Sequence, residues 1–377
     1  MANTLTGLIP VMYAAMNRTS RERIGLIGAV SRDPTAEAAA VDQTVRSPVV
    51  GAMAAQDITP SNVSATGTDQ TIEYVDVVIT KQRKVPFHLT GEQEKGLGPN
   101  NVPIAQQRFE QAFRTLGNEI ESDLTALYYN ASRAYGTAGT TPFGTGDDLT
   151  DASEVMRILD DNGAPGIDRH LVIGSAATAK LLGKQPSVFR VNEAGEAMGR
   201  RFGSLQDLFG FEFHHSGQIK QHTAGAGTGY LANGGEPIGE TAMVLDTGSG
   251  TILQGDVVTF AGDSNKYIVK EDGTTVLATL NKPGLRETLA DNAAMTIGAG
   301  YTANMALTRD AIQLAARVPA VPTGGDNADD RMYITDPISG LVFEITVYRQ
   351  YRQVTFEVAI CWGVKAIKPE HMALLLG

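Results

Sequence analysis

One apolar stripe between residues 101 and 135 constrains the fold more than any other feature of the sequence. Its members are spaced by four, three, four, four, three and four residues, the period of an α-helix: Phe109, Phe113, Leu116, Ile120, Leu124, Leu127 and Ala131. Pro103 suits the first turn of such a helix, and Gly136 suits its end. A continuous helix from Pro103 to Tyr135 would be about 50 Å long, since each residue adds ~1.5 Å. We therefore expect a helical spine with strands laid along it.

Strand-like segments occur on both sides of this helix in the sequence. Residues 44–50 and 72–80 are extended runs, and the stretch 59–69 between them is polar and rich in turn-forming residues. This pattern predicts a long hairpin with a loose tip, which needs a neighbouring surface to lie against. Near the C-terminus, residues 341–348 and 354–362 alternate in polarity. They predict a long antiparallel pair with one buried face, and residues 369–376 predict a last apolar strand.

The middle of the chain divides into an α/β part and a β part. In the first, we expect a helix that starts at the capping-box-like Asp151–Glu154, a strand from His170, and a helix from Ser175 to Leu182. A helix at 205–210 and a strand at 211–215 complete this part. Residues 218–235 look like a loop. Short β runs separated by glycine turns follow and predict a small all-β unit: 242–245, 257–260, 267–269, 276–280 and 295–297.

Charge and composition exclude several classes of protein. The chain has 31 Lys and Arg against 42 Asp and Glu, a net charge of −11, so it is a poor candidate for gripping nucleic-acid phosphates. The single cysteine, Cys361, excludes an intrachain disulfide framework and a cysteine-rich zinc site. No segment reaches the ~18 continuous apolar residues of a membrane span, which predicts a soluble, cytoplasmic chain without a membrane partner.

Three histidines lie near one another in the sequence: His214, His215 and His222. Zinc needs a third or fourth ligand in fixed geometry. Neighbours on a strand point to opposite faces, so His214 and His215 cannot easily bind one ion. We expect polar loop residues here and no metal site.

Three other motifs also favour plain structural interpretations. The glycines of 225–229 lack the preceding strand and following helix of a dinucleotide-binding loop, so they predict a linker. The acidic run 326–330 has Ala328 where a calcium loop needs an oxygen ligand, so it predicts a solvated turn. Cys361 has no neighbouring base and predicts a core thiol. The sequence indicates no catalytic residue, no cofactor and no enzyme.

Three segments resemble the coat proteins of tailed double-stranded-DNA bacteriophages. Residues 304–317 resemble the family's segment built around Arg-Asp-Ala, here Arg309-Asp310-Ala311. The stretch from Trp362 to Glu370 resembles its closing aromatic-Gly-Val segment, and residues 253–262 resemble the β-domain of one subgroup. Leu307 and Thr308 depart from the Phe-His that the family often has there.

The resemblance implies an α+β, Hong Kong 97-like capsid fold with a small all-β insertion domain. Seven segments would then make it up: an N-terminal arm (1–40), an extended hairpin loop with flanking strands (41–100), the peripheral domain with its spine helix (101–148), an axial domain (149–217), the inserted domain (218–302), peripheral strands (303–362) and a closing axial strand (363–377). Composition leaves open whether the arm is a surface helix with a linker or packs on another copy.

The resemblance also implies a function. It is that of a major capsid protein that self-assembles into pentamers and hexamers of an icosahedral head around packaged double-stranded DNA. Its partners would be further copies of itself, a scaffolding protein, a portal, a decoration or cement protein, and DNA bound without sequence specificity. Its location would be the virion, after assembly in the host cytoplasm. The alternatives are an encapsulin-like nanocompartment shell and a hydrolase that uses the His214 region.

Six charged residues are the candidate contacts between subunits. Lys81, Arg83 and Lys84 form a short basic patch at the base of the predicted hairpin. Such a patch is either a solvated face or a set of ion pairs between subunits. We expect intersubunit contacts for this patch and for Asp329, Asp330 and Arg331.

Overall fold

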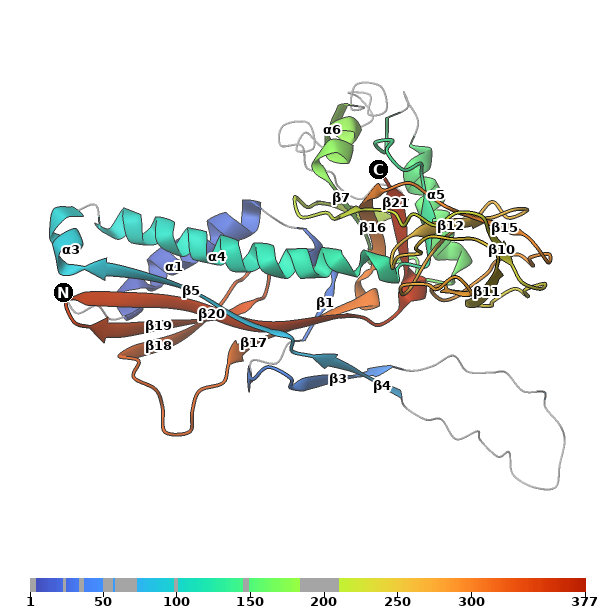
Figure 1. Cartoon of the computed structure of the whole chain (residues 1–377). Helices are drawn as coiled ribbons and strands as arrows, with labels where there is room; N and C mark the ends of the chain where they lie inside the picture. Colours follow the sequence, from blue (N-terminus) through green and yellow to red (C-terminus); the bar gives the residue numbers. More distant parts are fainter. Residues whose placement is uncertain are drawn as a thin grey trace.

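The chain folds into a mixed α+β structure with an elongated part and a second part at one end (Figure 1). The computed structural model describes residues 5–22, 25–33, 37–49, 57, 73–97, 101–144, 149–183 and 210–377. None of the helices in these ranges combines the length and the apolar character needed to cross a membrane.

The spine helix is α4 (Asn101–Thr125), and its apolar stripe is buried as the spacing predicts. The expected continuation to Tyr135 is wrong. The chain tightens into the 3₁₀ helix η2 (Ala126–Asn130) and then enters the strand β6 (Arg133–Tyr135). Pairing of β6 with strands from two other parts of the chain outweighs the helical spacing. At ~1.5 Å per residue, α4 alone spans about 38 Å.

A seven-stranded sheet lies along α4, with the long strand β20 at its centre (Figure 1). β20 pairs antiparallel with β17 and β19, as well as with β5 along ten residue pairs. The β19–β20 pair confirms the predicted C-terminal hairpin. The strands are β1 (Ser31–Arg32), β2 (Ala38–Ala39), β5 (Lys81–Thr90), β17 (Ile312–Pro319), β18 (Asp330–Thr335), β19 (Val342–Gln350) and β20 (Gln353–Ala366).

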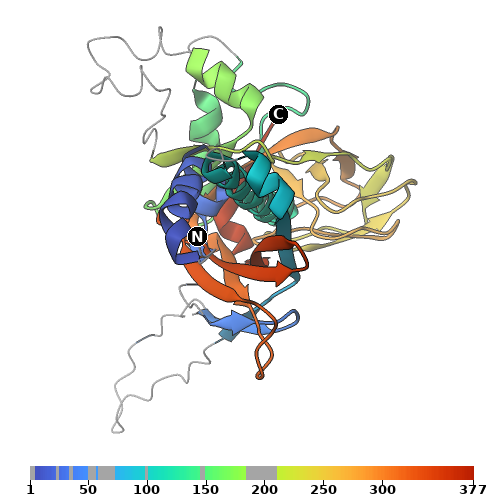
Figure 2. The same ribbon diagram turned by 90° about the vertical axis from the view of Figure 1, so that its left-hand side faces the viewer.

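Aromatic side chains join α4 to this sheet. Phe109 lies with its ring centroid 4.9 Å from that of Phe87 on β5 and 5.8 Å from that of Phe356 on β20. The helix α1 (Leu5–Glu22) packs beside α4 through the buried Met12 and Met16 (Figure 2). The sequence left open whether this segment is a surface helix or packs on another copy, and its described part forms a helix that contacts its own chain.

Two short helices complete this part of the molecule. α2 (Leu26–Ala29) is held by Glu121 of α4, whose carboxylate accepts hydrogen bonds from the backbone N–H groups of Leu26 (2.6 Å) and Ile27 (3.0 Å). α3 (Gly91–Leu97) follows β5 directly. Glu121 thus satisfies two backbone donors at the start of a helix that has no capping side chain of its own.

A two-stranded hairpin projects from the sheet, as the sequence predicts (Figure 1). It consists of β3 (Thr44–Val49) and β4 (Glu73–Val78), paired antiparallel from Thr44–Val78 to Val49–Glu73. The predicted loose tip at 59–69 lies outside the described residues. The base of the hairpin crosses β20 so closely that a Cβ on Gly363 would lie 1.9 Å from the carbonyl oxygen of Val78. This approach requires glycine at that position.

The second sheet contains the predicted α/β elements. Its strands include β7 (Arg169–Ile173), β8 (Phe211–His215), β9 (Gln221–His222), β16 (Tyr301–Thr308) and β21 (Met372–Leu376), with β6 beside β21; the helices are α5 (Thr150–Asp161) and α6 (Ser175–Gly183). The expected capping box at the start of α5 does not form. Asp151 instead accepts a hydrogen bond from the backbone N–H of Phe143 (2.5 Å). Residues 205–209 of the predicted helix lie outside the described residues, and Gly210 is in a turn.

The small all-β unit lies to one side of the molecule (Figures 1 and 2). It has its own hydrophobic core. Its strands confirm the predicted runs: β11 (Ala242–Asp246), β12 (Val257–Phe260), β13 (Lys266–Ile268), β14 (Leu277–Thr279) and β15 (Ala294–Ile297). The predicted loop at 218–235 is partly wrong, because it contains β9 and β10 (Tyr230–Ala232). β13 pairs with β6, so the unit continues the second sheet.

Candidate functional site

The six predicted contact residues all lie on or beside the seven-stranded sheet. Side-chain alternation divides the basic patch on β5 between the two faces of that sheet. Lys81 and Arg83 point toward α4, where the Lys81 Nζ lies 2.7 Å from Asp123 and the Arg83 Nε lies 3.6 Å from Glu119. Lys84 points to the opposite face, 2.9 Å from Glu357 of β20.

Lys81 is tied to the interior by its partner, although its own side chain is 37% exposed. Its partner, Asp123, also accepts a hydrogen bond of 2.8 Å from the indole N–H of Trp362, which is fully buried. The Lys81 ammonium lies 6.0 Å from the centre of the Trp362 ring. One carboxylate of α4 therefore anchors both β5 and β20. Lys81 is committed to this contact, whereas the Arg83 side chain is 58% exposed.

The open face of the sheet carries a network of paired charges. Lys84 and Arg331 line one hollow there, together with Glu344, Tyr348 and Glu357. Arg331 lies 2.6 Å from Glu344 and 2.5 Å from Asp326. Burial raises the pKa of the Glu344 carboxyl, and the guanidinium of Arg331 acts in the opposite direction. Paired charges of this kind orient a docking partner more than they add affinity.

The acidic run at 326–330 is engaged within the chain. Asp326 accepts hydrogen bonds from the hydroxyl of Tyr348 (3.0 Å) and from the backbone of Ala328 (3.1 Å). Asp329 pairs with Arg349 at 2.8 Å, and Asp330 accepts a hydrogen bond from the backbone N–H of Arg331 (2.9 Å). These contacts fix the turn before β18.

Three exposed aromatic side chains were not predicted from the sequence. Tyr351 is 90% exposed at the turn between β19 and β20, Tyr74 is 55% exposed on β4, and Tyr333 is 53% exposed on β18. Tyrosine combines a large contact area with a polar tip and is enriched at protein interfaces. The charged turn at 349–353 was visible in the sequence, but the exposure of Tyr351 depends on the strand register.

The expectation that His214, His215 and His222 are polar loop residues is wrong, because all three lie in strands, and His214 and His222 are buried. His222 lies apart from the other two, 2.7 Å from Asp256 and 2.9 Å from the hydroxyl of Tyr128. His214 and His215 do point to opposite faces of β8, as the strand period predicts. His215 is exposed and lies 3.2 Å from the hydroxyl of Ser175, whereas His214 is buried.

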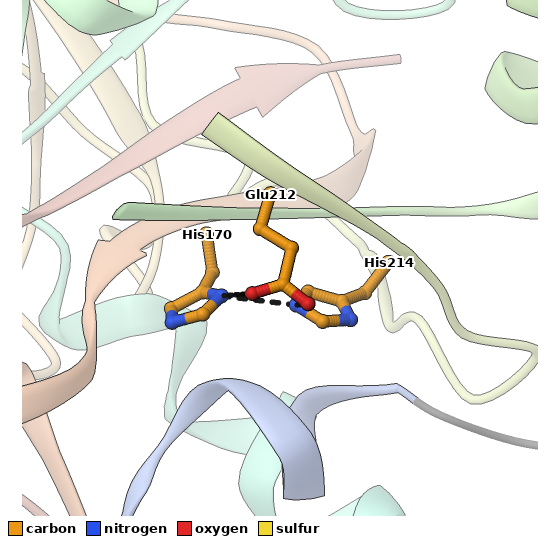
Figure 3. A group of neighbouring side chains, drawn as sticks. All are labelled: His170, Glu212 and His214. Atoms are coloured by element: carbon orange, nitrogen blue, oxygen red, sulfur yellow. Dashed lines mark hydrogen bonds and ion pairs between the residues drawn. The ribbon is translucent and has the colours of Figure 1, made fainter. Parts of the chain in front are cut away.

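His214 instead faces His170, which the sequence analysis placed in a strand and did not consider as a site. The His170 Nδ1 lies 2.9 Å from the His214 Nε2, and Glu212 lies beside both rings (Figure 3). Both histidines are more than nine-tenths buried. Burial lowers the pKa of His170, and it lowers the pKa of His214 to about 4, so both rings are neutral at pH 7. We call His170, Glu212 and His214 the β7–β8 triad.

Two further groups border the triad. Asp168 lies 3.0 Å from the His170 Nε2 and 2.8 Å from the Arg309 Nε. The hydrogen bond from Arg309 lowers the pKa of the Asp168 carboxyl. Arg309 also donates to the backbone carbonyl of Gly28 beside α2 (2.9 Å). The triad is therefore held between the second sheet and the N-terminal region.

Cys361 is a core thiol, as the sequence predicts. Its side chain is fully buried, and burial raises the pKa of the thiol to about 11. A protonated, inaccessible sulfur is a poor nucleophile.

Comparison with known proteins gives a match in fold. No family model matches the chain, and no curated protein matches it. The capsid structure of the cyanophage P-SCSP1u matches with a TM-score of 0.50 and 10% identity, over 94% of this chain and 88% of that chain.

Two other solved structures match with lower scores. The mature capsid of bacteriophage PhiM1 has a TM-score of 0.43 and 8% identity, over 93% of this chain and 85% of that one. The virus-like particle from Pyrococcus furiosus has a TM-score of 0.43 and 11% identity, over 97% and 98%. The assignment of fold rests on the cyanophage match: the chain has the fold of that capsid subunit.

Proposed function

We propose that this chain is the major capsid protein of a tailed bacteriophage, which assembles into pentamers and hexamers of an icosahedral head around double-stranded DNA. The observation that carries this proposal is the match to the cyanophage capsid structure, because it extends over 94% of this chain.

The shape of the subunit supports the same function. Two strands alone form the β3–β4 hairpin that projects from the sheet, and such a hairpin is at most marginally stable without a neighbour (Figure 1). A second subunit beneath it would supply that surface. In this assignment the hairpin is the extended loop, α4 with the seven-stranded sheet is the peripheral domain, and the second sheet is the axial domain. The proposed boundaries follow the seven segments that the resemblance implies, except that β5 would belong to the peripheral domain and β6 and β16 to the axial domain, because of the sheets in which they pair.

The charges of the subunit suit reversible assembly. A closed shell needs contacts that are individually modest, so that misplaced subunits dissociate before they are trapped. Head-to-tail contacts must also close by rotation into rings. The open face around Lys84 and Arg331 offers already paired charges, which give register with modest affinity. A net charge of −11 suits a container for DNA, because an acidic wall does not bind the DNA phosphates tightly.

The partners follow from the assembly. We propose further copies of the chain as the main partner, with a scaffolding protein, a portal and a decoration or cement protein as the others. DNA would be enclosed without sequence-specific contacts. The mature location would be the virion, after assembly in the host cytoplasm.

Electron microscopy of the purified protein tests the function. We expect closed shells, tubes or rings of subunits when the chain is expressed alone or with its neighbouring reading frames. Shells that contain a co-purified enzyme and no DNA would favour the encapsulin-like nanocompartment instead. A uniform monomer or dimer in both preparations would contradict any shell function.

A charge swap tests whether Arg83 acts between subunits. Arg83→Glu removes the pair with Glu119 and reverses an exposed charge, while R83E/E119R restores the pair with opposite polarity. If Arg83 contacts a neighbouring subunit, assembly followed by light scattering is slowed in both variants, and the swap recovers the thermal stability of the subunit. Full recovery of assembly in the swap would limit Arg83 to its own subunit.

A further inference from the structure

The β7–β8 triad gathers three metal-ligating groups on one face of a parallel strand pair. His170 on β7 is in register with Glu212 on β8, and Val172 is in register with His214. Partners in register point to the same face, as do residues two apart on one strand. The three side chains therefore converge, although His170 lies 42 residues before Glu212 and 44 residues before His214 in the sequence.

The distances between the ligand atoms match those around a bound ion. Tetrahedral zinc holds nitrogen and oxygen ligands at ~2.0–2.2 Å, which places neighbouring ligand atoms roughly 3.3 Å apart. The His170 Nδ1 lies 2.9 Å from the His214 Nε2 and 3.4 Å from the Glu212 Oε2, and the His214 Nε2 lies 3.7 Å from the Glu212 Oε1. A shift of a few tenths of an ångström would complete the three-ligand geometry.

We propose that the β7–β8 triad binds one divalent transition-metal ion, zinc foremost, through the His170 Nδ1, the His214 Nε2 and the Glu212 carboxylate. Two imidazoles and one carboxylate suit zinc, whereas calcium and magnesium prefer all-oxygen sites. The Glu212 side chain is 53% exposed, so the fourth position opens to water.

Asp168 supplies the outer contact that metal-bound histidines usually have. It lies 3.0 Å from the His170 Nε2, the ring nitrogen that faces away from the ion. A carboxylate there keeps that nitrogen protonated and leaves Nδ1 free to bind metal. The nearby charges favour a cation, because the carboxylates of Asp168 and Glu212 outnumber the one guanidinium of Arg309, whose Nη2 lies 3.1 Å from the same nitrogen.

The same groups have a competing arrangement without an ion. Arg309 can donate to the His170 Nε2, and His170 can then donate from Nδ1 to the His214 Nε2. This chain of hydrogen bonds needs no metal and leaves Glu212 without a role. The contribution of Glu212 therefore distinguishes the two arrangements.

The bound ion would join β8 to the rest of the second sheet. Among the described strands, β8 lies at the edge and pairs with β7 alone. An ion bound to both strands adds a cross-link where hydrogen bonds exist on one side. Because the ion binds the folded chain, its concentration raises the thermal midpoint of unfolding.

Metal titration of the full-length chain tests the site. The protein is stripped with a chelator, and zinc is titrated in competition with a chromophoric indicator. Cobalt is used as a spectroscopic probe. We expect one ion per chain, a visible cobalt spectrum typical of four or five ligands, and a higher thermal midpoint. Absence of stoichiometric binding would overturn the proposal.

Variants assign the ligands. Glu212→Gln keeps the size of an exposed side chain and is expected to fold, but it should weaken zinc binding at least tenfold. His214→Ala should abolish the binding. His215→Ala, on the opposite face of the same strand, is the matched control and should bind as the unaltered chain does. Unchanged affinity in E212Q would exclude Glu212 as a ligand and overturn the three-ligand site. Shell formation is scored separately, so failure of either proposal leaves the other standing.

Discussion

Several contacts between helices and strands depend on a single carboxylate. Asp123 joins α4 to Lys81 of β5 and to Trp362 of β20, while Glu119, one turn earlier on the same helix, contacts Arg83 near the surface. A hydrogen bond to a charged group inside a protein stabilises more than an exposed ion pair does. The two acidic residues Asp123 and Glu119, on one face of α4, should therefore contribute differently to stability.

Asp123→Ala is predicted to lower the free energy of unfolding by about 2 kcal/mol, because it leaves the buried indole N–H of Trp362 without an acceptor. Glu119→Ala is the matched control and should cost about 0.5 kcal/mol or less. Urea unfolding of the two variants measures the difference. Equal losses would mean that Asp123 is not the anchor described above.

The sequence predicted some of these residues and not others. Cys361 was predictable as a core thiol because it lies within an alternating strand and has no base beside it in the sequence. The partnership of His170 and His214 was not predictable, because it depends on which strands pair and in what register. His222 is close to His214 in the sequence, but in the fold it contacts Asp256 instead.

At the scale of elements, the periodicity of apolar residues predicted which helices and strands form better than it predicted where they end. The stripe of α4 and the β19–β20 pair were predictable because each buries one regular face. The end of α4 at Thr125 was not, since the following residues keep helical spacing but are drawn into β6 by pairing with β21 and β13. The pairing of β5 with β20 was likewise not predictable, because the residues of a strand do not indicate which distant strand it will pair with.

Gly363 provides an element-scale prediction. Gly363→Ala should displace the β3–β4 hairpin from β20 and cost about 1–3 kcal/mol, because the new Cβ would meet backbone atoms of Val78. Gly117→Ala in α4 is the control, since a Cβ there meets nothing within 4 Å and alanine favours helix. Thermal unfolding checks both. A tolerated G363A would show that the hairpin base can move without loss.

At the scale of the whole molecule, the sequence predicted the order of the parts, and the structure adds how they join. The all-β unit has its own core yet shares a sheet with the second part through β13 and β6. Asn281 strengthens this junction, since its buried amide donates to the backbone carbonyls of Tyr129 (2.6 Å) and Ala131 (2.9 Å). The unit is thus continuous with the main body.

Substitution of Tyr351 tests the proposed assembly at the scale of the whole molecule. Its ring is 90% exposed at the far turn of the β19–β20 hairpin. Tyr351→Ser should change the stability of the isolated subunit by less than about 0.5 kcal/mol, as surface substitutions do. If the turn contacts another subunit, the yield of shells by electron microscopy should fall. An unchanged yield would place the turn outside the contacts.

The central position of β20 has a mechanical consequence. Residues 353–362 of this 14-residue strand pair with β5 on one side. On the other side, residues 353–359 pair with β19 and residues 361–366 with β17. A tension directed along β20 loads these bonds in shear, so many must break together before the strand slides. A tension across the sheet would peel them apart one by one. The molecule is therefore stiffest along β20, which runs in the direction of α4 (Figure 1). In the proposed shell, this is the direction in which each copy would best resist stretching of the wall.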